Sequence, residues 1–259
     1  MSLILLSWQN LIDSSATVLT ASQQAGDLAI ENVANPIVGR RWRTTSLTAW
    51  GQADFGSDQE IGVVGLVFPR DTTFPTSGTI THTFDADGGT AGAGAALDSG
   101  AVAIGTVAGY GYHLYRPTTP VTARYWRWTF NVSGVNFIDV GRAWAGEAWR
   151  PSVNISLGWG DEWGDLSRLS AAAKSGAEFV DPGPRQRAVA FGLDFMSDED
   201  RADVREMQRI AGLSNQVLFC QDPDAYARET ILGRIAESTP IREPGLSIYS
   251  KAFRIRESL

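Results

Sequence analysis

Apolar and polar residues alternate in short runs along the first half of the chain, with turn-forming residues between them. The runs cover residues 61–68, 78–84, 101–107, 124–132 and 136–143. Successive side chains of a β-strand point to opposite faces, so each run predicts a strand. Several short strands at this spacing are typical of an antiparallel sandwich or barrel. We therefore predict a β-sandwich over residues 1–145.

The pattern after residue 185 predicts one helix among strands. Residues 187–195 alternate as a strand, and Ser197 followed by three acidic residues is typical of a helix start. We expect this helix to carry an apolar stripe of Val204, Met207 and Ala211, and to end at Gly212. Further strands are predicted at 216–220, 229–237 and 246–255.

Residues 142–187, between these two patterns, follow neither period and predict an irregular bridge. The segment contains Trp144, Trp149, Trp159 and Trp163 with glycines among them. So aromatic a segment is expected to pack against other parts of the protein. We therefore predict a mainly β protein with two domains, a sandwich at 1–145 and a β-sheet-with-helix unit at 146–259 that includes most of the bridge.

Composition and charge exclude several kinds of function. Cys220 is the single cysteine of 259 residues and there are two histidines, so neither a disulfide framework nor a cysteine- or histidine-built metal centre is expected. No apolar run approaches the roughly 20 residues that span a bilayer. The short apolar run at 3–6 follows no basic segment, so we expect synthesis in a cytoplasm without secretion. The net charge of -7 argues against binding to nucleic-acid phosphates.

Three segments of the first half resemble the discoidin-like modules related to the coagulation-factor C-type domain. They are Val-Gly-Arg-Arg-Trp-Arg-Thr at 38–44, Ala-Asp-Phe-Gly at 53–56 with the apolar strand at 60–66, and Thr-Ala-Arg-Tyr-Trp-Arg at 122–127. The resemblance covers about half of the chain and implies a jelly-roll β-sandwich of the galactose-binding-like kind. The terminal cysteine pair that is frequent in that family is absent here.

The second half resembles the distal-tail and minor-tail proteins of long-tailed bacteriophages. The shared pattern is a strand at 189–195, an acid-capped helix at 197–212, a short strand, an aspartate-proline turn at 221–224, and two long strands. The resemblance implies a virion tail-tip or baseplate protein, made in the host cytoplasm, that forms a three-fold or six-fold ring with itself. Its further partners would be the tail tube, the tail hub or fibres, and host surface glycans.

The aromatic residues nearest to predicted loops are the candidates for sugar recognition, since sugar sites combine aromatic stacking with a few polar groups. A role in the sandwich core or at a subunit seam is the alternative for each of them. The candidate glycan-binding residues are Trp42, Trp50, Tyr110, Tyr112, Tyr115 and Arg116.

No pattern of residues predicts a catalytic site, a metal site or a cofactor. His82 and His113 lie outside any nucleophile motif, and Cys220 follows apolar residues as a buried thiol would. The acids Asp161, Glu162, Asp165, Asp222 and Asp224 are interpreted as solvated turn residues, and the segment at 84–89 lacks most ligands of a calcium loop. The main hypothesis is therefore a structural, non-enzymatic tail protein. A free carbohydrate-binding protein is the first alternative, and a glycosidase or lyase that uses Asp161 or Glu162 is the remote one.

Overall fold

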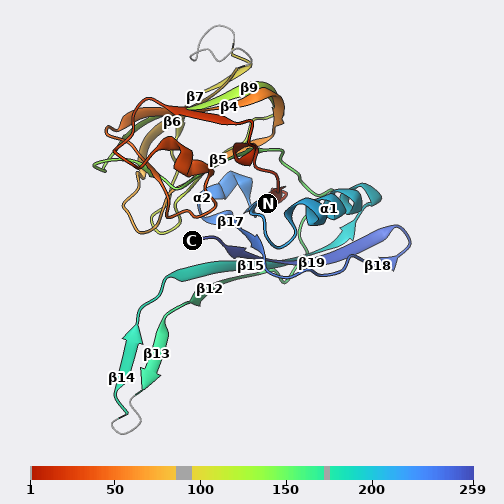
Figure 1. Ribbon diagram of the computed structural model, residues 1–259. Coiled ribbons are helices and arrows are strands. Elements are labelled where there is room, and N and C mark those ends of the chain that lie inside the picture. Colours follow the sequence, from red (N-terminus) through yellow and green to blue (C-terminus); the bar gives the residue numbers. More distant parts are fainter. Residues whose placement is uncertain (1, 86–94, 172–175) are drawn as a thin grey trace.

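A computed structural model describes residues 2–85, 95–171 and 176–259. The fold is mainly β, and its upper part in Figure 1 is a sandwich built largely from the first half of the chain. The larger sheet of this sandwich has five antiparallel strands in the order β2-β4-β9-β6-β7. Their bounds are Val18–Ala21 for β2, Thr48–Ile61 for β4, Val121–Ser133 for β9, Ser77–Asp85 for β6 and Leu97–Ala103 for β7.

A three-stranded sheet in the order β11-β5-β8 forms the second layer of the sandwich. Its strands are β5 (Val63–Val67), β8 (Tyr112–Tyr115) and β11 (Arg142–Gly146), and a separate small pair joins β3 (Trp42–Arg43) to β10 (Asp139–Val140). Short 3-10 helices, η1 (Leu11–Asp13) and η2 (Ile30–Ala34), close one side.

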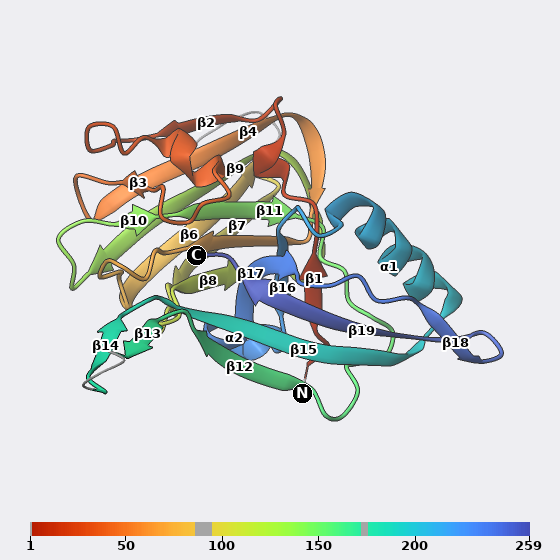
Figure 2. The same ribbon diagram turned by 60° about the horizontal axis from the view of Figure 1, so that its bottom comes forward.

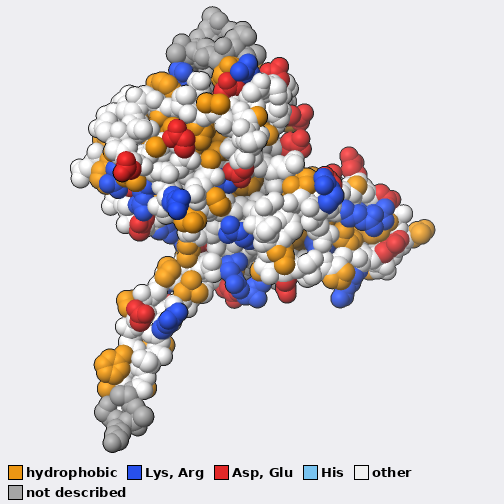
Figure 3. Space-filling model, in the orientation of Figure 1, with side chains coloured by type: hydrophobic (Ala, Val, Ile, Leu, Met, Phe, Trp, Pro, Cys, Tyr) orange, Lys and Arg blue, Asp and Glu red, His pale blue; other side chains and the backbone are white. Residues whose placement is uncertain are grey.

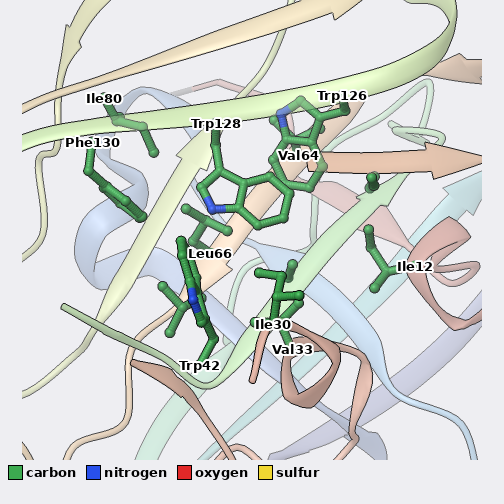
Figure 4. Packing of buried hydrophobic residues seen from close by; sticks show 14 of the residues in the cluster. Ile12, Ile30, Val33, Trp42, Val64, Leu66, Ile80, Trp126, Trp128 and Phe130 are labelled. Atoms are coloured by element: carbon green, nitrogen blue, oxygen red, sulfur yellow. The ribbon is translucent and has the colours of Figure 1, made fainter. Parts of the chain in front are cut away.

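Large aromatic side chains fill the space between the two layers (Figure 4). Trp126, Trp128 and Phe130 project inward from alternate positions of β9 and are fully buried. Gly51 on the neighbouring β4 makes room for them, because a Cβ there would lie 2.4 Å from the Trp128 ring. Regular alternation along β9 therefore places its large rings on the face that forms the core.

A third layer is a strongly twisted sheet of the C-terminal half, in the order β1-β16-β17-β19-β15-β12, with β18 attached to β19. Its strands are β1 (Leu5–Ser7), β12 (Gly160–Asp165), β15 (Arg185–Met196), β16 (Val217–Cys220), β17 (Thr230–Ile235), β18 (Arg242–Gly245) and β19 (Ile248–Glu257). The turn after β16 holds the short helices η3 (Pro223–Ala225) and α2 (Tyr226–Glu229).

Strand β1 ties the beginning of the chain into the C-terminal sheet. Leu5 pairs with Cys220 and Leu6 with Phe219, so the first strand lies beside β16 although more than 200 residues separate them. The side chains of Leu5 and Leu218 then pack against Val63 and Trp144 of the three-stranded sheet. The middle layer is thus buried on both faces. Where the chain divides into independently folding units stays a prediction.

Helix α1 (Asp198–Ala211) confirms the prediction made from its capping residues and apolar stripe. The Ser197 hydroxyl accepts a hydrogen bond from the Asp200 backbone N–H, and the Asp200 carboxylate accepts one from the Ser197 backbone, so the two form a capping box. Val204, Met207 and Ala211 are buried against the sheet. The helix and the sandwich together cover one face of β15 and β19 (Figure 1). None of the helices in the described part of the chain has both the length and the apolar content that a bilayer crossing demands.

The prediction of an irregular bridge at 142–187 was wrong. The segment contains β11 and β12, and beyond β12 a further pair of strands, β13 (Arg168–Ala171) and β14 (Glu178–Asp181). These strands are short and several face solvent on both sides, so their residues do not alternate between apolar and polar. Hydrogen bonding to a neighbouring strand, and not an apolar face, makes them strands. The run at 136–143 is likewise divided, into β10 and β11, at Gly141.

Candidate functional site

A two-stranded arm projects from the C-terminal sheet and is the most unusual feature of the molecule (Figures 1 and 2). We use the name arm for residues 166–184, of which 172–175 lie outside the described residues. Within the arm, β13 and β14 pair only with each other, with Leu169 opposite Val180 and Ser170 opposite Phe179. An isolated ribbon of two strands is marginally stable in water.

The arm and its approach carry large apolar side chains that face solvent. The arm alone exposes 73% of Leu169, 60% of Phe179 and 61% of Val180, and Figure 3 shows hydrophobic atoms along its length. The full set of such residues in this region is Leu157, Trp159, Trp163, Leu166, Leu169, Phe179 and Val180. Contiguous exposed apolar side chains of this kind mark protein-protein contact sites in soluble proteins.

The base of the arm is fixed to the sandwich, so the ribbon leaves the body in a defined direction. The rings of Trp163 and Tyr110 meet edge to face at 5.9 Å, and the Arg70 guanidinium lies 5.0 Å from the Trp163 ring. Behind them, buried Arg187 donates to the Asp161 carboxylate at 2.7 Å. A ribbon that is anchored at its base and unsupported along β13 and β14 is suited to reaching a second molecule.

A second candidate surface lies on the outer face of the five-stranded sheet. Trp50 is part-exposed there, and the Arg127 guanidinium stacks 4.3 Å from the centre of its ring. Arg127 donates through Nε to Gln52 at 2.8 Å, and no ion pair to a carboxylate is found for it among the described residues. Burial lowers the pKa of Arg127. The pairing of β6 and β9 places Thr81 beside these residues, so ring, cation, amide and hydroxyl share one flat face.

The other glycan candidates from the sequence do not join Trp50 on this face. Trp42 and Tyr112 are buried, and their polar atoms are already bonded, Trp42 Nε1 to the Gln23 carbonyl and the Tyr112 hydroxyl to Glu257. Tyr115 stacks on His82 in the core, Tyr110 contacts the base of the arm, and Arg116 is exposed on its own. Of the six candidates, Trp50 alone lies on this face.

The two histidines form a buried relay inside the sandwich. The indole N–H of Trp126 donates to His82 Nδ1 at 3.2 Å, which leaves His82 Nε2 to donate to His113 Nε2 at 2.9 Å. His113 Nδ1 then donates to the Ile104 carbonyl at 2.6 Å. Burial lowers the pKa of both imidazoles, to about 4 for His113. Both rings are thus neutral near pH 7 and structural in role.

The interpretation of Asp161, Glu162 and Asp165 as turn residues was wrong, because they lie in strand β12, whereas Asp222 and Asp224 do lie in the turn after β16. Asp161 pairs with Arg187, Glu162 with Arg254, and Asp165 accepts from the Ser167 backbone. Among the described residues, no group of three or more metal-ligating side chains converges. Cys220 is buried, and burial raises the pKa of its thiol to about 12. The calcium-loop fragment falls largely outside the described residues.

Sequence reasoning missed Arg127, Gln52 and the apolar face of the arm. The arm could have been found from two short β-prone pieces, Arg-Leu-Ser at 168–170 and Glu-Phe-Val at 178–180, on either side of a stretch of small residues. Their exposure could not have been found, because the same residues would be buried in a sheet with more strands.

No family model matches the chain, and no curated protein matches it. Solved structures with a similar fold include a fucosidase of Ruminococcus gnavus in complex with fucose, at 16% identity and a TM-score of 0.45, covering 54% of this chain and 27% of that one. Another is the family 32 carbohydrate-binding module of Clostridium perfringens NanJ in complex with galactose, at 12% identity and a TM-score of 0.43, covering 53% of this chain and 98% of the module. A third is the lectin-binding domain of lectinolysin in complex with Lewis b, at 13% identity and a TM-score of 0.43. The match covers 54% of this chain and 97% of that domain.

These likenesses concern about half of this chain, and the chain spans about a quarter of the fucosidase. The chain covers the carbohydrate-binding module and the lectinolysin domain almost completely.

Proposed function

We propose that this protein is a structural subunit of a larger assembly, without catalytic activity, and that the arm holds it there. The exposed apolar ribbon of the arm carries this proposal. Leu169, Phe179 and Val180 face solvent on a ribbon against which no third strand and no further layer of the described residues lies. Burial of apolar side chains of this size gains roughly 1.5 to 3 kcal/mol each, so association stabilises the ribbon.

The assembly that fits the resemblance of the second half is the tail tip of a long-tailed phage. In that setting, copies of the sheet-with-helix unit form the ring against the tail tube and hub, and the sandwich lies at its periphery. Two features support this arrangement: the outer edge of β12 is free of any strand partner among the described residues, and the sandwich lies on the opposite side of the molecule from the arm (Figure 1).

The test is the native mass of the purified full chain, compared with a variant in which residues 168–181 are replaced by Asn-Gly. We expect the full chain to form a three-fold or six-fold oligomer and the shortened variant to stay monomeric with the same circular dichroism. A matched control, Trp159→Ala, removes an exposed aromatic outside the arm and keeps the ribbon. A full chain that stays monomeric at tens of micromolar, and that is missing from purified virions, contradicts the proposal.

A second candidate function is carbohydrate binding by the sandwich. It is favoured by the cluster of Trp50, Arg127 and Gln52, in which an indole ring and a cation that pairs with no carboxylate among the described residues share a flat polar face. Sugar rings stack on indole through their C–H faces while hydroxyls take hydrogen bonds from side chains such as Arg127. A binding face at the periphery is compatible with a structural role for the rest of the chain.

Glycan-array binding of the full chain tests this second function. We expect Trp50→Ala and Arg127→Met each to lower the affinity at least about tenfold, equivalent to about 1.4 kcal/mol. Exposed Trp159, which lies outside both the arm and the sandwich, provides the control, since Trp159→Ala keeps the surface of the sandwich unchanged. Binding that survives both sandwich substitutions, or an array with no bound glycan, removes this candidate.

A further inference from the structure

We propose that the arm of one copy lies across the uncovered face of the C-terminal sheet of a second copy. This inference rests on the proposed assembly function and names the surface that receives the arm. We call that surface the seat. It is the face of β12, β15 and β19 that points away from α1 and the sandwich, and it comes forward in Figure 2.

The seat combines small residues on neighbouring strands with one ion pair, between Arg254 of β19 and Glu162 of β12. Ala190 and Gly192 of β15 and Ala252 of β19 point to this face, and Gly160 of β12 pairs with Ala190. They form the floor of an open hollow of about 680 Å³, with Leu157 at its margin. The Arg254–Glu162 ion pair bridges β19 and β12 beside Ala190, and no further layer of the described chain lies over the hollow, although the opposite face of β15 and β19 is packed.

One polar group in the wall of the hollow also lacks a partner. The Ser156 hydroxyl is buried and makes no hydrogen bond within the described chain, and it lies 3.8 Å from where a Cβ on Gly192 would stand. A buried hydroxyl without a partner costs about 1 to 3 kcal/mol. An incoming strand, with its backbone N–H and C=O groups, supplies the partner.

The arm matches the seat in shape and length. Leu169 and Val180 are opposite each other on β13 and β14, so their side chains project from one face of the ribbon. Large side chains fit onto a floor of alanine and glycine as they would not onto one of large residues. The described part of β13 and its approach, 166–171, spans roughly 17 Å, and the floor from 188 to 194 spans roughly 20 Å.

A second copy of the chain is the occupant because each copy holds one arm and one seat. The arm leads away from the seat of its own chain, so it does not fold back onto it (Figure 1). A foreign partner on the seat would leave the arm uncovered, whereas a second copy covers both. Contact of arm with seat joins two different surfaces, and repetition of such a contact closes a ring.

The experiment uses two variants of the full chain that each disable one side of the contact. Ala190→Arg places a long charged side chain on the floor of the seat, and the double variant Leu169→Glu with Val180→Glu places charges on the arm. We expect each variant alone to self-associate at least about tenfold more weakly than the unmodified chain. Mixed together, they should form a dimer of one copy each, because one contributes an intact arm and the other an intact seat.

Two further variants keep the outcome unambiguous. Ala252→Arg blocks the same floor from β19, and Ala101→Arg introduces the same charge at an exposed position of β7, far from the seat. If both seat variants assemble like the unmodified chain while the arm variant does not, the seat is wrong and the assembly function stands. If the unmodified chain and the arm variant are both monomeric, the proposed function itself fails.

Discussion

The sandwich and the arm contain the same kinds of residues and use them in opposite ways. Trp42, Trp126 and Trp128 are fully buried between two sheets, whereas Trp163 and Phe179 lie exposed along and beside the arm. The difference comes from the number of layers. A strand with a sheet on each side buries every large side chain, and a two-stranded ribbon with no layer against it buries none. Aromatic content therefore marks the core in one region and a contact surface in the other.

The largest expected difference between the two regions is in the stability change on removal of a tryptophan. Trp42→Ala should lower the free energy of unfolding by about 3 to 5 kcal/mol, because it empties a packed site and leaves the Gln23 carbonyl without its indole donor. Trp159→Ala, on the exposed side, should change it by less than about 0.5 kcal/mol. Urea unfolding followed by circular dichroism measures both. Equal losses of unfolding free energy in the two variants would contradict the distinction between a buried and an exposed aromatic region.

The pH dependence of stability is the next largest effect, and it reports on the core of the sandwich. The depressed pKa of His113, about 4 against an ordinary 6.5, means that the unfolded chain binds a proton in this window and the folded chain does not. The contribution of His113 to the free energy of unfolding is therefore fully present above pH 6.5. It is lost as the pH falls towards 4, by about 3 kcal/mol in all.

Unfolding in urea at several pH values between 7.5 and 4 checks this effect. The double variant His82→Gln with His113→Gln should lose that part of the slope, while the slope due to carboxylates stays. An unchanged slope in the double variant means that the buried relay does not control acid stability.

A smaller effect is expected at the N-terminus of α1. Ser197→Ala removes the hydroxyl that accepts from the Asp200 backbone N–H, and should cost about 1 kcal/mol. Thermal unfolding shows whether this loss appears in the same transition as the loss from Trp42→Ala. Two separate transitions, each sensitive to one substitution, would show that the two regions unfold independently in spite of the shared middle layer.

The smallest stability change is expected in the arm itself. Phe179→Ala should leave the free energy of unfolding of the monomer within about 0.5 kcal/mol, since the ring has no covering layer to lose. Sedimentation at increasing concentration should nevertheless show weaker association. A marked loss of stability in the monomer would mean that the ring is packed against its own chain, and would contradict the assignment of the arm to a contact between copies.

Local patterns predicted much of the fold. The alternating run at 124–132 became β9, and the capping residues at 197–200 with the stripe Val204, Met207 and Ala211 became α1. The discoidin-like resemblance agrees with the sandwich. These predictions held because strand alternation and helix capping act between residues close together in the chain.

The sites were predicted less well, since a sequence does not tell which side of a sheet is covered. Trp42, Trp50 and Tyr112 looked equivalent as candidates for sugar binding, and only Trp50 has surroundings that fit a ligand. Arg127 was not among the candidates, because its stacking on Trp50 depends on the register between β4 and β9.

The sequence by itself determined that the protein is mainly β, that one acid-capped helix lies in its second half, and that it has no disulfide framework. Only the tertiary structure decided that the first strand closes the last sheet, that residues 166–184 form an arm, and that no layer of the described chain covers one face of β15 and β19. The physical reason is that burial depends on which layers meet, and strands more than 200 residues apart in the chain bring those layers together.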